Sequence, residues 1–275
     1  MKKLKSILLL LIIIPCMLFF TACGDDNSDN NENNNNNSAE KVLYYTLSSD
    51  EKYYVISGIG TLTDTSIVIP EKYDNKPVKE IGEDAFRGAT TLTNIQIPSS
   101  VTNIGAYAFN GCTGLTALEI PSSVTNIGAY AFNGCTGLTT MKIPISVTSV
   151  SSGIFNGCTG LTSVEIPSSV TSIGSSAFSE CTGLKSIEIP SNVTTIGSGA
   201  FYGCTGLTSM DIPDNVISIG SSAFSGCVSL TEIEISNSIT SIESGLFNGC
   251  VSLTNIEIPN SVTSIGSSAF YGCIS

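Results

Sequence analysis

The sequence predicts a β-dominated solenoid, in which the chain winds through repeated coils that contact mainly their neighbours. A unit of 23 residues occurs eight times from Leu92 to Ser275 without insertion or deletion, and a leucine opens each copy. A phenylalanine recurs at one phase of the unit from Phe86 to Phe270. Proline closes an alternating apolar stretch in all copies but one, as expected at the end of a strand. A fixed short period of this kind is typical of repeat architectures and disfavours an enzyme.

The first 22 residues have the pattern of an export signal. Lys2, Lys3 and Lys5 precede an apolar run over residues 7–20, and small residues follow at positions 21 and 22. The alternative is a retained membrane helix. That alternative is disfavoured because Pro15 interrupts the run and because about 20 apolar residues are needed to span a bilayer. We therefore expect residues 1–22 to be a signal peptide, of the lipoprotein type that the next residues indicate.

The segment Phe20-Thr21-Ala22-Cys23 resembles a bacterial lipobox, whose cysteine is acylated and becomes the first mature residue. The resemblance implies that Cys23 carries lipid and anchors the protein to the membrane of the bacterial cell envelope. Residues 23–41 are acidic and rich in asparagine, a composition that stays disordered. A flexible tether of this length reaches roughly 25 Å from its anchor. Its acidic start resembles lipoproteins displayed on the outer surface, so we expect display there.

Residues 42–91 differ from the repeats and predict a cap. Residues 42–47 and 53–56 have the composition of two strands around a turn at residues 48–51, which is typical of a hairpin. Residues 67–70 and 80–88 then imitate the strand and the return of the later units, with five extra residues between them. We expect an N-terminal hairpin cap and a degenerate first coil, followed by eight repeats over residues 92–275.

Within one unit, counted from its leucine as position 1, apolar residues occupy positions 1, 4, 6, 10, 13, 17, 18 and 21. Positions 4 and 6 predict a strand, and positions 10 and 13 predict a shorter extended stretch. The Ala-Phe pair at positions 17 and 18 predicts a tight turn or a short helical turn. Two units move a turn glycine by two places, to Gly153 and Gly245, which suggests an alternative turn with its own packing. The core column expected at position 18 contains Phe109, Phe132, Phe155, Phe178, Phe201, Phe224 and Phe247.

Eight of the ten cysteines share position 21; of the other two, Cys16 leaves with the signal and Cys23 takes the lipid. Neighbouring coils spaced like strands, at about 4.8 Å, hold parallel Cβ atoms farther apart than the roughly 3.8 Å of a disulfide. Zinc is disfavoured because the sequence has no histidine and no coil offers two clustered cysteines. We expect a stack of small buried side chains, with oxidised neighbouring pairs as the alternative. This cysteine ladder contains Cys112, Cys135, Cys158, Cys181, Cys204, Cys227 and Cys250, and it ends at Cys273.

The unit Leu-x-x-Ile-x-Ile-Pro-x-Ser-Val-Thr-x-Ile-Gly-x-x-Ala-Phe-x-Gly-Cys resembles the BspA-like class of bacterial leucine-rich repeats, over about residues 59 to 275. The resemblance implies a leucine-rich-repeat solenoid with α/β-type, β-dominated repeats and one continuous parallel sheet. It also implies a surface protein that serves as a protein-binding or adhesion module. The partner would then be a protein, such as host matrix or another cell's surface. No cofactor and no metal are implied.

Charge limits the partners further. Loss of the three lysines of the signal would leave 8 of the 11 basic side chains against 23 acidic ones, a net charge of −15. Such a charge disfavours nucleic acid and anionic membrane surfaces. Position 5, on the exposed side of the expected strand, is a carboxylate in each of the last five units. This acidic column either docks a basic segment or weakly held divalent cations, or is a solvated face whose charge blocks aggregation. The candidate partner-binding residues are Glu165, Glu188, Asp211, Glu234 and Glu257.

Catalysis finds little support in the sequence. There is no histidine and no phosphate-binding loop, and the serines belong to the repeat. Tyr107 and Tyr130 share position 16 in adjacent units and form either a small aromatic patch or surface cover. The sequence ends directly after a complete unit, so the last coil frays, is covered by something else, or continues in a longer chain. A structural spacer or self-associating envelope component is therefore the alternative function.

Overall fold

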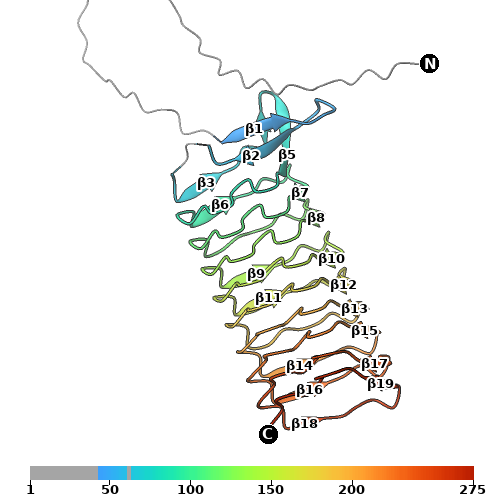
Figure 1. The fold of residues 1–275 in the computed structure, drawn as a ribbon. Coiled ribbons are helices and arrows are strands. Elements are labelled where there is room, and N and C mark those ends of the chain that lie inside the picture. Colours follow the sequence, from blue (N-terminus) through green and yellow to red (C-terminus); the bar gives the residue numbers. More distant parts are fainter. Residues whose placement is uncertain (1–42, 61–62) are drawn as a thin grey trace, which may run out of the picture. The chain divides into compact units, whose positions relative to one another are not determined.

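The computed structural model describes residues 43–60 and 63–275. The expected signal peptide, the lipidation of Cys23 and the expected tether lie outside these residues. The described residues form a stack of coils that begins at an N-terminal cap (Figure 1). No helix found among them has the length and apolar character needed to cross a bilayer.

The cap begins with a β-hairpin. β1 (Tyr44–Leu47) pairs antiparallel with β2 (Tyr54–Gly58). β2 then pairs parallel with β5 (Lys76–Ile81), and β5 pairs parallel with the next coil. The hairpin is thereby joined to the repeats by backbone hydrogen bonds, so that it covers the first coil.

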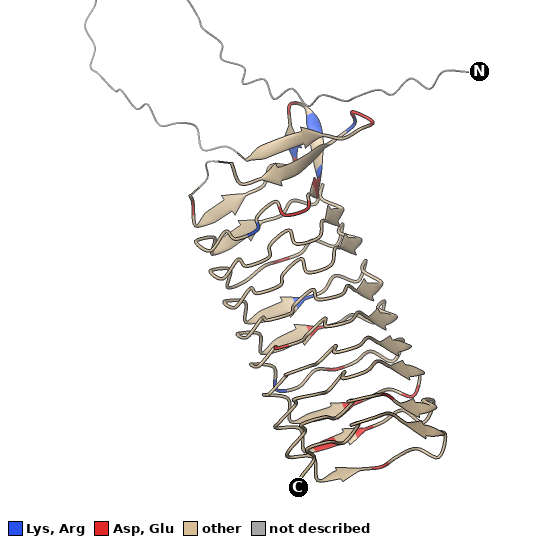
Figure 2. Cartoon of the chain, viewed as in Figure 1, with Lys and Arg blue, Asp and Glu red and all other residues tan. Residues whose placement is uncertain are grey.

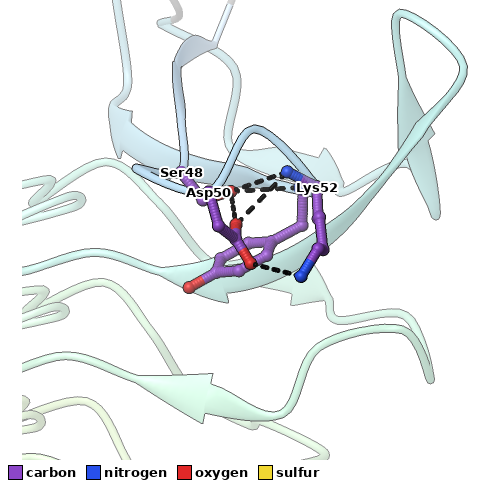
Figure 3. A network of polar contacts seen from close by, with 4 residues as sticks. Ser48, Asp50 and Lys52 are labelled. Atoms are coloured by element: carbon purple, nitrogen blue, oxygen red, sulfur yellow. Dashed lines mark hydrogen bonds and ion pairs between the residues drawn. The ribbon is translucent and has the colours of Figure 1, made fainter.

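A polar network closes the turn of this hairpin (Figure 3). The Ser48 hydroxyl donates to the Asp50 carboxylate at 2.7 Å and accepts from the backbone N–H groups of Lys52 and Tyr53 at 3.2 and 3.1 Å. The Lys52 ammonium lies 3.3 Å from the same carboxylate. The hydrogen bonds from the Ser48 hydroxyl and the Lys52 backbone lower the pKa of Asp50. The carboxylate that organises the turn is therefore charged at neutral pH.

The five extra residues of the first coil form a second hairpin. β4 (Lys72–Tyr73) pairs antiparallel with the start of β5. The turn residues Asp74 and Asn75 both have positive φ, 45° and 60°, a conformation that asparagine and aspartate tolerate. Tyr73 stacks on Tyr45 of the first hairpin with ring centroids 4.0 Å apart. This aromatic contact holds the two hairpins of the cap together.

The coils contribute short parallel strands in two rows. Facing residues differ by 23 positions, as Val164 opposite Met141 and Ile173 opposite Ile196 illustrate. Only the pairing of β3 with β6 has an offset of 28, because it spans the second hairpin. The first row contains β3 (Ser66–Val68), β6 (Asn94–Gln96), β9 (Thr140–Lys142), β11 (Ser163–Glu165), β14 (Ser209–Asp211), β16 (Glu232–Glu234) and β18 (Asn255–Ile256). The second row contains β5, β7 (Asn103–Ile104), β8 (Asn126–Ile127), β10 (Ser149–Val150), β12 (Ser172–Ile173), β13 (Thr195–Ile196), β15 (Ser218–Ile219), β17 (Ser241–Ile242) and β19 (Ser264–Ile265).

The β-dominated solenoid of 23-residue coils is confirmed, and it differs from expectation in one detail. Parallel pairing is divided among several short sheets on two sides of the coil, where one continuous sheet was expected. The first row is interrupted at residues 117–119 and 186–188, and proline follows nearly every strand in it. The return segment holds no helix within the described ranges. Positive φ at positions 16 and 20, for example 54° at Tyr107 and 71° at Gly111, is incompatible with a continuing right-handed helix.

Phenylalanine fills the centre of every coil. The rings from Phe86 to Phe247 are fully buried, and neighbouring rings stack with centroids 5.1–5.8 Å apart. Each ring from Phe109 to Phe247 is covered by the ring of the coil before it and of the coil after it. The core is therefore continuous along the stack, and a single coil cannot bury its own phenylalanine.

The cysteine ladder runs beside the phenylalanine column. The ladder thiols from Cys112 to Cys250 are fully buried, and Cys273 is partly exposed. Each sulfur donates to the phenylalanine carbonyl of the preceding coil at 3.0–3.3 Å, beginning with Cys112 to Phe86. Burial raises the pKa of the Cys158 thiol to about 12. All eight ladder cysteines are free thiols in the described structure.

Candidate functional surface

The outer face of the first strand row presents position 5 of every coil. Positions 4 and 6 point into the core because a strand turns successive side chains to opposite faces. Ile233 and Ile235 are accordingly buried, while Glu234 between them is exposed. All five candidate carboxylates are exposed on this face. Figure 2 shows that acidic segments recur along the later coils of the stack.

The five carboxylates are not equivalent. The Glu165 carboxylate lies 2.7 Å from the Lys142 ammonium of the preceding coil, and both side chains are well exposed. An exposed pair of this kind adds little to stability, but it neutralises the charge of Glu165 locally. No ion pair within the described residues involves the other four carboxylates. The uncompensated part of the acidic column therefore begins after Glu165.

A groove of about 1020 Å³ lies over β14, β16 and β18. Its lining includes Asp211, Glu234 and Glu257, so the structure brings together three of the five candidate residues. Register places Asp211 directly opposite Glu234 on paired strands. The sequence has no lysine or arginine after Lys185. The carboxylates of this acidic groove thus have no basic residue of the later coils beside them.

Sequence reasoning overlooked Glu232 as a member of this groove. It occupies position 3 of the same strand as Glu234, and both side chains are exposed. The signal was available, because two residues that are two apart on one strand share a face. Glu188 and Glu165, by contrast, do not line the groove. The concentrated negative charge therefore lies over the last three coils, with its centre at β16.

Tyr107 and Tyr130 form a closed stack on the turn side of the coils. Their rings are parallel within 3°, with centroids 5.2 Å apart. The Arg87 guanidinium lies 5.5 Å from the centre of the Tyr107 ring and pairs with Asp84 at 3.0 Å. A Cβ atom added to Gly153 would lie only 2.1–2.7 Å from three atoms of the Tyr130 ring. The two rings are thus sandwiched between Arg87 and the Gly153 backbone and do not form an open aromatic platform.

The displaced glycine of the third repeat is explained by the same contact. Position 16 has positive φ in every described coil, including 57° at Tyr130 and 61° at Gly153. The Tyr130 ring occupies the space that a side chain at position 153 would need. A glycine is therefore required there by its neighbour in the preceding coil. Sequence patterns within one unit cannot reveal this requirement, because the contact joins two units.

The described part of the chain contains no candidate metal centre with three or more protein ligands. No group of three or more histidine, cysteine, aspartate or glutamate side chains is placed there to hold one ion. What the geometry offers is a long exposed face with an acidic groove. Such a face is suited to binding a macromolecule.

The arrangement defines a parallel β-solenoid repeat protein. The exposed residues on one of its strand faces differ from coil to coil. The chain belongs to the family described as the BspA type leucine rich repeat region, whose model matches residues 63–185 and 171–275 with six copies. No match was found among curated proteins.

Solved structures of several bacterial proteins are similar to this chain. A leucine rich cell surface protein from Faecalibacterium prausnitzii A2-165 is 31% identical, with 83% of this chain and 84% of that chain covered and a TM-score of 0.44. The leucine rich repeat protein of T. pallidum is 27% identical, with 86% and 88% covered and a TM-score of 0.45. The pneumococcal vaccine antigen PcpA is 18% identical, with 84% and 80% covered and a TM-score of 0.51.

Proposed function

We propose that this chain is an exported, surface-anchored adhesion protein that binds a protein partner through the acidic groove of its solenoid. Membership of a leucine-rich-repeat family supports a role in protein binding. One similar protein is described as a cell surface protein. The observation that carries the proposal is the groove over β14, β16 and β18, in which carboxylates gather without any basic neighbour.

The charge of the groove determines how the partner is recognised. Carboxylates aligned on one face attract a positively charged surface and speed its encounter with the solenoid. The groove carboxylates are exposed, so salt screens this attraction strongly above physiological ionic strength. The partner is therefore a protein with a basic segment, and its capture weakens as salt is added.

The test is capture of purified matrix proteins and of host or neighbouring cells by the displayed mature chain. Reversal of the groove charges by Asp211→Lys, Glu234→Lys and Glu257→Lys should reduce capture at least tenfold. A matched control reverses three exposed carboxylates elsewhere, by Glu51→Lys, Glu83→Lys and Glu180→Lys, and changes the net charge equally. Equal capture by both variants would exclude the groove as the binding site.

The anchor is the second half of the proposal and is tested separately. Cys23→Ala should abolish incorporation of a labelled fatty acid and move the protein from the membrane fraction to the medium. Retention of the variant in the membrane would contradict anchoring through Cys23.

End-to-end association of the purified chain that rises with concentration and needs no ligand would favour the structural alternative over adhesion.

A further inference from the structure

The cysteine ladder has a chemistry that partner binding does not use. The ladder sulfurs from Cys112 to Cys250 are buried in the apolar core, and all eight ladder cysteines are free thiols. Each one donates to the equivalent carbonyl of the preceding coil, as Cys158 does to Phe132 and Cys181 to Phe155 at 3.1 Å. The sulfurs therefore share one orientation, and the ladder is a row of equivalent thiols with one member in each coil.

Backbone hydrogen bonds set the spacing of that row. The N–H groups of Phe109 and Gly111, three residues and one residue before Cys112, donate to the next coil at 2.8 and 2.7 Å. Chain segments joined in this way lie about 4.7–4.9 Å apart. Because the side chains are oriented alike, neighbouring sulfurs are separated by a similar distance of about 5 Å. The phenylalanine rings of the same turns repeat at 5.1–5.8 Å. A disulfide, whose sulfurs are about 2.05 Å apart, would require the coils to move.

One metal ion fits in line between two such sulfurs. A metal–thiolate bond is about 2.3 Å long, so two bonds in line span roughly 4.6 Å. That length is slightly shorter than the spacing of the coils, and small rotations of the two cysteine side chains supply the difference. Only two ladder sulfurs can reach any one point between two coils, which excludes the four-coordinate geometry that zinc adopts in structural sites.

The charge of the ion is limited by the core. A net charge among buried phenylalanine and isoleucine side chains is strongly unfavourable. Two thiolates and one divalent ion make a neutral unit, whereas a monovalent ion would leave one negative charge. Soft ions prefer thiolate ligands. A soft divalent ion that accepts two ligands in line therefore satisfies distance, charge and ligand type together.

We propose that neighbouring cysteines of the ladder bind such an ion pairwise, with Hg(II) as its representative. Two thiols each release a proton to solvent, the ion gives up two chloride or water ligands, and two metal–sulfur bonds form. No electron is transferred, and the S–H hydrogen bonds to the phenylalanine carbonyls are given up. Eight thiols in one row allow four such pairs per chain.

The stoichiometry of binding tests this proposal. Mercuric chloride is titrated into the mature chain carrying Cys23→Ser, so that the ladder supplies every thiol, and bound ions are counted by native mass spectrometry. Two double variants each leave six thiols but different numbers of neighbours. Cys158→Ala with Cys181→Ala leaves three adjacent pairs, whereas Cys158→Ala with Cys204→Ala isolates Cys181 and leaves two.

Four ions for the intact ladder, three for the first variant and two for the second are expected. X-ray absorption should show two sulfur neighbours for each bound mercury. Alanine at this phase is compatible with the fold, since Ala89 occupies it in the first coil. Eight ions followed by six in both variants would mean one ion per thiol and would overturn the proposal. Binding that begins only when the chain unfolds would overturn it as well.

Discussion

At positions where the backbone is in the left-handed region, any residue other than glycine lowers the stability of this solenoid. Position 20 is glycine in every described coil except one, where Glu180 adopts a φ of 59°. Glu180 is exposed and its backbone N–H donates to Tyr202 in the next coil. The backbone of this coil is thus held in the conformation that its neighbours reach with glycine.

Replacement of Glu180 by glycine should therefore stabilise the fold. We expect Glu180→Gly to raise the free energy of unfolding by about 0.5–1 kcal/mol, because relief of left-handed strain exceeds the added chain entropy of glycine. Urea denaturation measures the difference. Ser225→Gly, at position 19 where φ is negative, is the control and should lower stability. A loss of stability in both variants would show that Glu180 carries no strain.

Gly153 provides a second test at this scale. Gly153 and Gly199 have the same φ of 61°, but an added Cβ would lie 2.1 Å from the Tyr130 ring in the first case and 3.5 Å from the Ser176 hydroxyl in the second. Both alanine substitutions carry a left-handed cost of about 1–2 kcal/mol. Gly153→Ala should cost about 0.5–1.5 kcal/mol more, because it also disrupts the tyrosine stack.

The additional loss of stability in Gly153→Ala, relative to Gly199→Ala, should disappear when Tyr130 is replaced by serine. A double-mutant cycle between Gly153→Ala and Tyr130→Ser, measured by thermal unfolding, isolates the contact. A coupling energy near zero would mean that the ring moves aside freely and that Gly153 serves only its own backbone.

At the scale of elements, the phenylalanine column should contribute more stability than any surface feature. Phe178 is fully buried between the rings of Phe155 and Phe201. Phe178→Ala should lower the free energy of unfolding by about 3–5 kcal/mol, since the cavity cannot collapse between two stacked rings. Tyr202→Ala, at a side chain that is 46% exposed, should change it by less than about 0.5 kcal/mol. Similar losses in the two variants would contradict the column as the main source of stability.

The cysteine ladder makes stability dependent on alkaline pH. Burial raises the pKa of Cys158 and Cys204 from the ordinary value of 9.0 to about 12. Between these values the unfolded chain loses protons that the folded chain keeps, so the stabilisation is complete below pH 9 and falls as the pH rises towards 12. Each thiol should contribute a loss of about 1.4 kcal/mol per pH unit in that window.

Thermal unfolding at pH 7 and pH 10.5 measures this effect. The variant with Cys158→Ala and Cys204→Ala should lose less stability between the two pH values than the unmodified chain. An identical loss would assign the alkaline sensitivity to tyrosines, among which burial raises the pKa of Tyr45.

Periodicity was sufficient to predict which residues share a column, because a fixed offset of 23 places them in register. The burial of Phe178 and the exposure of Glu234 both follow from the phase of the unit. Contacts between different phases were not predictable. Such contacts depend on how far a side chain reaches into the next coil. Examples are the ion pair of Lys142 with Glu165 and the contact of the Tyr130 ring with Gly153.

The groove could be predicted only in part, for a related reason. Alternation along a strand placed Asp211, Glu234 and Glu257 on one face. Whether a face is flat or hollow depends on the relative displacement of successive coils, which a repeated sequence does not encode. The proposed site is therefore narrower than the five carboxylates along the stack, because the groove lies over the last three coils and also includes Glu232.

For the whole molecule, identical offsets mean that coils are interchangeable units. Deletion of residues 161–183 removes one complete unit and joins two segments in the correct phase. We expect the shortened chain to fold, with a slightly lower melting temperature, because stability in such arrays is a sum over coils and their interfaces.

A deletion of about half a unit, residues 161–172, is the matched control. It places polar residues at core phases in the joined coil and should lower the melting temperature far more, or divide the unfolding into two transitions. Circular dichroism distinguishes the outcomes. Comparable melting of both deletions would mean that the 23-residue register does not govern the assembly.

The hydrogen bonds between coils run along the direction in which the coils succeed one another, and this has a mechanical consequence. Tension between the two ends is borne by the boundaries in series, so the weakest boundary sets the load at which the array yields. Thr116 and Thr139 donate to the preceding coil at 3.5 Å, whereas Thr162 does so at 2.9 Å. The equivalent N–H group of Lys185 makes no such hydrogen bond to Thr162 within the described residues. Rupture under a pulling force should therefore start at the interrupted boundaries of the first row, between residues 116 and 188, and the coils that carry the acidic groove would detach from the cap still folded.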